Sequence, residues 1–216
     1  VAKRTFLFFR TLFYNLIYSV KRPESFYSKD YFIQCHYCTN DPHEKIIKDA
    51  QAEYIVRAVH PAKVLVAGCA AGELVRALRL KNVQAWGFDF SGVIKDVAYS
   101  EVVDYLRVGS VTDIPFDRVD QFDALVVFDV FEHIPLKDVN KMVEEINRLA
   151  PKFLITIIAH ESLFIGHITL MPLSWWEGKL SKHYRRINDI SVDTRGIPEV
   201  YGLNDPLNPI RIWERL

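Results

Sequence analysis

The sequence shows no excess of charge of either sign. Its 216 residues include 27 lysines and arginines and 27 aspartates and glutamates, so the formal net charge is zero at neutral pH. Proteins that hold nucleic acid through bulk positive charge have a basic balance instead. We therefore predict no nucleic-acid partner, although a local basic patch is compatible with this total.

The sequence also lacks a long apolar run. No stretch approaches the about 18 consecutive apolar residues that a membrane-spanning helix requires. Residues 1–22 instead combine many aromatic residues with lysines and arginines, a pattern typical of a helix lying on a membrane surface. We favour a helix that packs over the domain or its substrate pocket, with weak membrane-surface contact as the alternative. A signal peptide is disfavoured, because no small-residue cleavage site follows.

Cysteine is scarce as well. The three cysteines of the chain do not make a disulfide framework. Cys35 and Cys38 form a single C-x-x-C pair, whereas a structural zinc site needs a full set of well-spaced ligands. We therefore predict reduced thiols, a cytoplasmic location and no bound metal.

Short apolar segments alternate with helix-like segments through most of the chain. Apolar runs at 63–67, 83–88, 105–108, 122–128 and 153–158 indicate buried strands, and the apolar spacing at 44–60, 73–80, 93–99, 137–150 and 175–183 indicates helices. Unbroken apolar strands are typical of parallel sheets covered on both faces. The alternation predicts an α/β fold with a Rossmann-like, doubly wound sheet. One or two closing strands are expected in the tail, around 210–216.

The length suits one good-sized domain with an extension. We divide the chain into a cap or lid at residues 1–45 and a main domain at residues 46–216. Doubly wound sheets bind their ligands at the carboxyl ends of the strands. The residues that follow each strand are therefore the candidates for a site.

The first strand leads into a loop that contains Gly68 and Gly72. A dinucleotide-binding fingerprint has the pattern G-x-G-x-x-G, and a P-loop ends in Gly-Lys-Ser or Gly-Lys-Thr; this loop has neither. Glu73, which opens the next helix, would also repel a pyrophosphate. The two common phosphate-binding loops are therefore disfavoured.

The second strand ends at Asp89. An acid at this place can accept hydrogen bonds from the hydroxyls of a ribose. Its alternative role is to cap the following helix. Because Ser91 can fill that role, we favour the ribose contact for Asp89.

Four segments stand in register along the chain: VLVAGCAAG, GFDFS, GSVTDIPF and FDALVVFDVFEHI. Together they resemble the motifs of class I S-adenosylmethionine-dependent methyltransferases of the small-molecule type, similar to the type 11 and type 12 families, and the resemblance spans residues 64–158. It implies a seven-stranded, mostly parallel sheet with an N-terminal helical cap. It also implies S-adenosylmethionine as the cofactor and S-adenosylhomocysteine as the product.

The same resemblance implies where the cofactor makes its contacts. The methionine part would lie on the backbone of the glycine loop, the ribose on Asp89 and the adenine against Phe90. Ser110 and Val111 would meet the adenine edge, while Asp129 and Val130 would border the reactive sulfonium. The full implied set is Ala67, Gly68, Cys69, Ala70, Gly72, Asp89, Phe90, Ser110, Val111, Asp129 and Val130.

Three positions depart from the family's motifs. Val66 replaces an acid of the first strand, Ala70 replaces the middle glycine, and Ser110 replaces an acid near the adenine. Loss of the first acid either weakens cofactor binding or moves its role to another residue. The alanine is a mild change only if its φ stays negative, and the serine can still hydrogen-bond the adenine amine.

Methyl transfer from a sulfonium needs an aligned acceptor and, where the acceptor carries a proton, a base. Histidine titrates near neutral pH, so His133 is the first candidate; its alternative is a structural role at a helix start. Glu132 would orient it, His160 is the second candidate, and His167 is the third. The alternative to our prediction of no metal is a site built on Asp129, Glu132, His133 and His160.

Residues 160–190 are the expected acceptor-pocket insertion. They include an H-x-x-x-x-P-x-x-W-W pattern, from His167 to Trp175 and Trp176, that loosely resembles a segment of family members linked to sugars. The tryptophans either stack on a sugar ring or pack inside the domain at the start of a helix. The nearby basic residues either meet an acidic acceptor or face solvent: Lys179, Lys182, His183, Arg185 and Arg186.

We therefore predict a methyltransferase that acts on an oxygen of a small molecule, either a sugar or a secondary metabolite. Two alternatives stay open: a cofactor-binding or scaffold domain that has lost catalysis, and a peripheral membrane enzyme with a lipid-linked acceptor. The segment after the fourth strand lacks the Pro-Pro-aromatic motif of amino-methylating enzymes, and the chain has no Pro-Cys dipeptide. Both absences again disfavour a nucleic-acid substrate.

Overall fold

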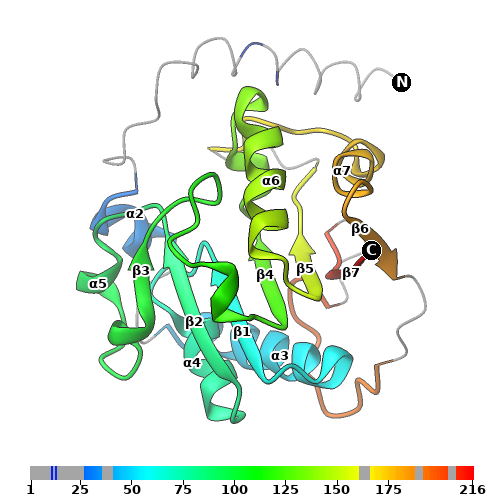
Figure 1. The fold of residues 1–216 in the computed structure, drawn as a ribbon. Helices are drawn as coiled ribbons and strands as arrows, with labels where there is room; N and C mark the ends of the chain where they lie inside the picture. Colours follow the sequence, from blue (N-terminus) through cyan, green and yellow to red (C-terminus); the bar gives the residue numbers. More distant parts are fainter. Residues whose placement is uncertain are drawn as a thin grey trace.

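A seven-stranded sheet organises the part of the chain that the structure describes (Figure 1). The computed structural model describes residues 11, 13, 27–35, 41–160, 166–187, 192–203 and 208–216. The strands are β1 (Lys63–Ala67), β2 (Gln84–Asp89), β3 (Leu106–Val108), β4 (Ala124–Phe128), β5 (Phe153–Ile157), β6 (Tyr184–Ile187) and β7 (Arg211–Arg215). They lie in the order β3-β2-β1-β4-β5-β7-β6.

The strands β1 to β5 run parallel to one another, and β7 lies antiparallel between β5 and β6. The strand order reverses between β1 and β4, because the chain winds outward from β1 in one direction and from β4 in the other. Such a switch point is where open α/β sheets bind ligands. The predicted α/β class and the Rossmann-like, mostly parallel sheet are confirmed.

Helices cover both faces of the sheet, with α6 and α7 in front and α3 and α4 behind in Figure 1. The helices are α2 (Lys29–Gln34), α3 (Pro42–Val59), α4 (Glu73–Leu80), α5 (Ile94–Val97), α6 (Val139–Leu149) and α7 (Leu173–Leu180). Successive side chains of a strand point to opposite faces. Val64 and Val66 of β1 therefore pack in the core under α3 and α4, whereas Leu65 and Ala67 pack in the core under α6 and α7.

The boundaries of α3 follow from its end residues. Asp41 Oδ1 accepts hydrogen bonds from the backbone N–H groups of His43 (2.9 Å) and Glu44 (3.1 Å), which caps the first turn. At the other end His60 adopts the left-handed conformation, with φ 45°. Pro61 follows directly and cannot continue the helix. The helix predicted over 44–60 is confirmed.

Two elements differ from expectation in the last quarter of the chain. The helix expected at 175–183 begins at Leu173, directly after Pro172, and ends at Leu180. Residues 181–183 form a turn, and β6 follows as an edge strand that no apolar period indicates, because two of its four residues are exposed arginines. The closing strand expected near 210–216 is β7. Its Trp213 is buried and donates a hydrogen bond through Nε1 to Thr156 Oγ1 of β5 (3.0 Å).

Most of the N-terminal predictions fall outside the described residues. Of residues 1–22, the structure describes Thr11 and Phe13. The buried Thr11 hydroxyl donates to the backbone carbonyl of Leu170 (3.4 Å) and accepts from its N–H (3.1 Å). Cys35 is a free thiol, and Cys38 is outside the described residues. Within the described part of the chain, no helix has both the length and the apolar character needed to cross a membrane.

Candidate active site

A cavity of about 1020 Å³ lies at the carboxyl ends of β1, β2 and β4. Its volume suits a ligand of cofactor size. Of the predicted cofactor residues, all but Gly72 line it. The cavity also lies at the reversal of strand order, so the predicted location of the site agrees with the sheet topology.

The two glycines of the loop have different tasks. Gly68 has φ 67° and lies so close to the wall that an added Cβ would be 2.5 Å from Cγ2 of Val130. A side chain at this position would therefore fill the cavity between β1 and β4. Gly72 has φ 85°, and a Cβ there would meet the side chains of Val102 (3.0 Å) and Leu106 (3.2 Å) behind the loop. Its role is packing, which explains why it does not line the cavity.

The middle residue of the loop departs from expectation. Ala70 has φ 47°, so the condition under which alanine would be a mild replacement for glycine is not met. A left-handed non-glycine residue costs about 1 to 2 kcal/mol. The N–H of Ala70 donates to Asp89 Oδ2 (3.0 Å), and this hydrogen bond helps to hold the strained loop.

Asp89 has a structural role beside any contact with a ribose. Its Oδ1 accepts from the N–H of Ser91 (3.0 Å), so it helps to form the turn after β2 as well as the glycine loop. The Ser91 hydroxyl donates to the carbonyl of Tyr27 (2.6 Å) and accepts from the N–H of Val93 (3.4 Å), so Ser91 shares the turn with Asp89 and does not replace it there. Burial raises the pKa of the Asp89 carboxyl. The ribose contact stays a prediction.

Ser110 and Val111 lie where the adenine is expected. Both line the cavity, together with Thr112. The Ser110 hydroxyl is 2.9 Å from Thr112 Oγ1 and accepts a hydrogen bond from the Thr112 N–H (3.1 Å). The serine therefore shapes the turn, and a contact with the adenine amine stays a prediction.

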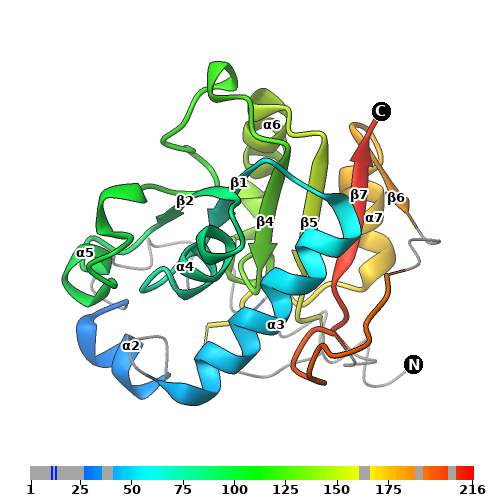
Figure 2. The ribbon, with the colours of Figure 1, turned by 90° about the horizontal axis from the view of Figure 1, so that it is seen from below.

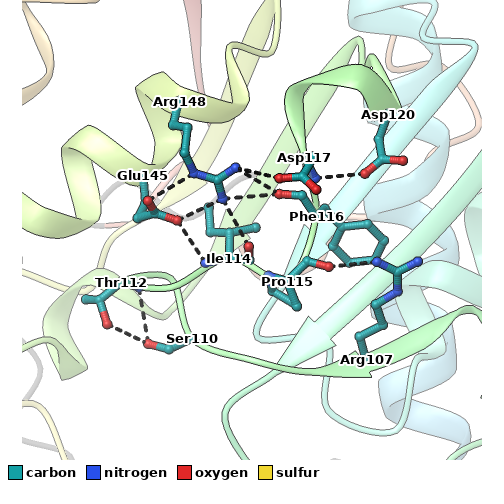
Figure 3. A network of polar contacts seen from close by, with 10 residues as sticks. All are labelled: Arg107, Ser110, Thr112, Ile114, Pro115, Phe116, Asp117, Asp120, Glu145 and Arg148. Atoms are coloured by element: carbon teal, nitrogen blue, oxygen red, sulfur yellow. Dashed lines mark hydrogen bonds and ion pairs between the residues drawn. The ribbon is translucent and has the colours of Figure 1, made fainter.

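Charged side chains hold the segment that follows Thr112 (Figure 3). Glu145 of α6 accepts a hydrogen bond from the N–H of Ile114 (3.0 Å), and Arg148 of α6 donates to the carbonyls of Ile114 (3.0 Å) and Phe116 (3.1 Å). Arg148 also pairs with Glu145 (2.9 Å). On the other side, Arg107 of β3 lies over the Phe116 ring, 4.1 Å from its centroid. Sequence reasoning missed this network, because its charges lie on the polar side of α6.

The hydrogen bonding of Glu73 bears on whether the site fits S-adenosylmethionine. Its side chain is 5% exposed, and its Oε1 pairs with Arg76 (2.7 Å). Among the described residues, no donor lies within hydrogen-bonding distance of the buried Oε2. Glu73 lines the cavity, and buried carboxylates require a cation or a donor. Arg76 satisfies Oε1, and the α-ammonium group of the cofactor would supply a donor to Oε2, so Glu73 is our candidate for the role of the acid that Val66 replaces.

The far end of the cavity contains a residue that sequence reasoning missed. Tyr201 belongs to the segment 192–203, which runs beside α3 (Figure 2). Its hydroxyl donates to Asp129 Oδ1 (2.6 Å), directly after β4, and its backbone carbonyl accepts from Nε2 of the buried Gln51 (3.0 Å). Both Tyr201 and Asp129 line the cavity. When bound, S-adenosylmethionine supplies an electrophilic methyl group, and the predicted place of that group is this end.

Two histidines meet at the same end. His133 and His167 line the cavity, their ring centroids are 4.8 Å apart, and their planes are nearly perpendicular at 86°. Glu132 is fully buried below them, with Oε1 accepting from the N–H of Ala159 (3.3 Å) and lying 3.9 Å from His167 Nε2. Burial, followed by the nearby Asp129 carboxylate, raises the pKa of Glu132 well above its ordinary value.

His160 is placed differently from the expectation. It is partly buried after β5, its Nδ1 is 3.4 Å from the carbonyl of Ile158, and it is not among the residues that line the cavity. The structure instead brings His167, the third candidate, against Glu132 and His133. The group of possible metal ligands that the structure brings together also differs from the one considered from the sequence. It contains His167 in place of His160, and it lacks Asp129.

The tryptophans and the basic residues of the 160–190 segment lie away from the cavity. Trp176 is fully buried against Phe131, with ring centroids 5.3 Å apart, and Trp175 packs edge-on against Trp176. The structure supports the packing interpretation rather than a sugar platform. The basic side chains have local partners: Lys182 and His183 lie near Glu144, Arg185 pairs with Glu214, Arg186 pairs with Glu177, and Lys179 bonds to Asn140.

Aromatic residues of the N-terminal segment form one wall of the cavity. Tyr27, Tyr31 and Phe32 line it, and the Tyr27 ring meets those of Phe90 (6.3 Å) and His133 (6.4 Å) edge-on. Residues 27–34, a described part of the predicted cap, therefore face the site.

These features define a Rossmann-like α/β domain with a cofactor cavity at the carboxyl edge of its sheet. Residues 65–152 match the family model of the methyltransferase domain. The match identifies residues 65–152 as a methyltransferase domain, in agreement with S-adenosylmethionine as the predicted cofactor. The match favours the enzyme over a scaffold domain.

Solved structures with low sequence identity share the fold. The PH0226 protein from Pyrococcus horikoshii OT3 has a TM-score of 0.68 and 14% identity, with 88% of this chain and 100% of that chain covered. Magnesium protoporphyrin IX methyltransferase (ChlM) from Synechocystis PCC 6803, with bound SAH, has a TM-score of 0.58 and 16% identity, with 89% and 96% covered. The mitomycin 7-O-methyltransferase MmcR has a TM-score of 0.59 and 14% identity, with 80% and 54% covered. No curated protein matches the sequence.

Proposed function

We propose that the enzyme transfers the methyl group of S-adenosylmethionine to an oxygen of a small molecule bound in the same cavity. The observation that carries the proposal is the pair His133 and His167, which meets the cavity beside Asp129, where the sulfonium is expected. An oxygen acceptor loses a proton as it attacks the methyl carbon, and S-adenosylhomocysteine leaves. An imidazole near neutral pH suits the removal of that proton.

The acceptor we favour is an aromatic or otherwise apolar metabolite rather than a sugar. The cavity lining includes the rings of Tyr27, Tyr31 and Phe32. The tryptophans that would carry a sugar platform pack elsewhere. Two proteins of similar fold act on mitomycin and on magnesium protoporphyrin IX, and the first is an O-methyltransferase.

Within this proposal His133 is the first proton acceptor, and Glu132 with His167 orients it. His160 remains the second candidate, but its position after β5 gives it no contact with the described cavity. Positioned general bases contribute about 10²- to 10⁴-fold to the rate. We expect His133→Ala to lower turnover by a factor in this range while S-adenosylhomocysteine binding is retained.

The test has two parts. Calorimetry with S-adenosylhomocysteine establishes cofactor binding, and labelled S-adenosylmethionine then screens phenols, hydroxylated polycyclic compounds, amines and sugars. The expected result is an O-methylated aromatic product whose formation falls in His133→Ala and not in the control His183→Ala, because His183 lies by Glu144 outside the cavity. Exclusive methylation of amines would contradict transfer to oxygen, whereas exclusive methylation of sugar hydroxyls would contradict the aromatic acceptor.

A further inference from the structure

Glu132, His133 and His167 form a group with the chemistry of a metal site. Each offers one ligand atom, and these atoms lie within 4.8 Å of one another. Two imidazoles and one carboxylate form a donor set that suits zinc and related divalent transition ions. Around a tetrahedral ion with ligand distances of about 2.0–2.2 Å, neighbouring ligand atoms lie about 3.4 Å apart. Side-chain rotations that shorten the separations by up to about 1.4 Å would complete the arrangement.

The backbone fixes the two segments that supply these ligands. The carbonyl of Glu132 accepts hydrogen bonds from the N–H groups of both Ile168 and Thr169 (2.9 Å each). The Thr169 hydroxyl donates to the carbonyl of Ile134 (2.6 Å) on the other side of His133. His167 is therefore held against the turn after β4 by three hydrogen bonds that do not involve its own ring. This preorganisation lowers the cost of bringing the ligands around an ion.

The buried carboxylate is the second observation that points to a cation. Glu132 is 0% exposed, and among the described residues no donor lies within hydrogen-bonding distance of its Oε2. A buried charge without a partner is costly, and a coordinated metal ion is one of the ways in which proteins avoid that cost. The imidazoles above Glu132 line the cavity, so the open positions of an ion held here would face the acceptor.

We propose that Glu132, His133 and His167 bind one divalent transition metal ion at the transfer end of the cavity. This inference rests on the proposed function, because the ion would hold the acceptor oxygen and lower the pKa of its hydroxyl. The hydroxyl proton then passes to solvent, and the oxygen attacks the methyl carbon of the sulfonium. In this form of the mechanism His133 is a metal ligand rather than the base.

The experiment measures metal binding without any acceptor. Tag-free protein is stripped with a chelator and titrated with Zn²⁺ by calorimetry and with Co²⁺ by visible absorption. The Cys35 and Cys38 pair can also take up these ions, so the titration is repeated with Cys35→Ser and Cys38→Ser combined. We expect one equivalent to bind in both backgrounds, with a cobalt spectrum free of thiolate charge-transfer bands.

Ligand variants decide the assignment. We expect His133→Ala, His167→Ala and Glu132→Gln each to weaken Co²⁺ and Zn²⁺ binding at least about tenfold, more than the loss of an outer partner usually costs. His183→Ala is the matched control and should bind like the wild type. Binding of S-adenosylhomocysteine by each variant shows that the fold is intact, and Glu132→Gln preserves side-chain volume if an alanine variant fails to fold.

Two outcomes would overturn the metal proposal: no stoichiometric binding, or binding that the His133 and His167 variants leave unchanged. In either case His133 acts as the base without a metal, and the proposed methyl transfer to oxygen still stands. Conversely, metal binding with methylation of nitrogen only would retain the site and overturn the proposed function. The two proposals can therefore fail separately.

Discussion

Replacement of Gly68 should damage both the stability and the cofactor site of this enzyme. In Gly68→Ala the new side chain must adopt a left-handed conformation, which costs about 1 to 2 kcal/mol. Its Cβ would also stand 2.5 Å from Cγ2 of Val130, so Val130 must move. Overpacking of this kind costs about 1 to 3 kcal/mol. The expected loss in the free energy of unfolding is therefore about 2 to 5 kcal/mol.

The effect on cofactor binding follows from the position of Val130, which lines the cavity. A shift that costs the bound state about 1.4 kcal/mol more than the free state lowers affinity tenfold. Urea unfolding gives the stability, and calorimetry with S-adenosylhomocysteine gives the affinity. We expect a loss of at least about tenfold in affinity, since the displaced side chain borders the predicted sulfonium position.

Two further variants separate the causes. Gly178→Ala is the matched control: Gly178 lies in α7 with no atom within 4 Å of an added Cβ, so this change should stabilise the protein by about 0.5 to 1 kcal/mol. In a double-mutant cycle with Val130→Ala, the loss in unfolding free energy caused by Gly68→Ala should shrink by the part due to the steric clash. The part due to the left-handed backbone should remain. Unchanged stability and affinity in Gly68→Ala would refute the reasoning.

Three more outcomes follow from the same cavity. Burial raises the pKa of Asp89, so the folded state binds its proton more tightly than the unfolded state does. The free energy of unfolding of the wild type, relative to that of Asp89→Asn, should therefore rise as the pH falls from above the raised pKa towards the ordinary aspartate pKa. Urea unfolding over a pH series checks the sign. Arg148→Ala should release the segment 114–116 and raise the dissociation constant for adenosine and S-adenosylhomocysteine alike, whereas equal affinities in calorimetry would show that this anchor does not shape the adenine end. Glu73→Gln should weaken S-adenosylhomocysteine, which carries the α-ammonium group, more than it weakens 5′-methylthioadenosine, which does not; equal losses would remove Glu73 from that role.

The sheet and the glycine loop are predictable from the sequence because their signals are local. Each parallel strand is a short apolar run, and the residues that follow it lie at one edge by topology alone. The order of the motifs is therefore enough to bring Asp89, Ser110 and Asp129 to the same edge of the sheet. The conformation of Ala70 is not predictable in this way. Its positive φ depends on a hydrogen bond to Asp89, which comes from the neighbouring strand.

The transfer end is harder to predict because it is assembled by contacts between distant segments. Tyr201 lies in a turn-rich tail with no period, and its neighbour Asp129 is 72 residues earlier. His160 and His167 both follow β5, and nothing in their local sequence separates them. The choice of His167 comes from the backbone pairing of the next two residues with Glu132, which is a tertiary feature.

A buried carboxylate with an unsatisfied oxygen occurs near each end of the cavity. Glu73 at one end and Glu132 at the other are buried carboxylates, and each has an oxygen for which the described residues provide no hydrogen-bond donor. A buried oxygen without a hydrogen-bond donor is costly to the isolated fold. A ligand that brings positive charge relieves this cost and binds more tightly for it. We expect the ammonium group of the cofactor to play this part at Glu73, and the proposed metal ion to play it at Glu132. On this reasoning, the two positions that cost the fold stability without ligands are the ones we expect to recognise them: Glu73 in the cavity wall, and Glu132 behind the histidines that line the cavity.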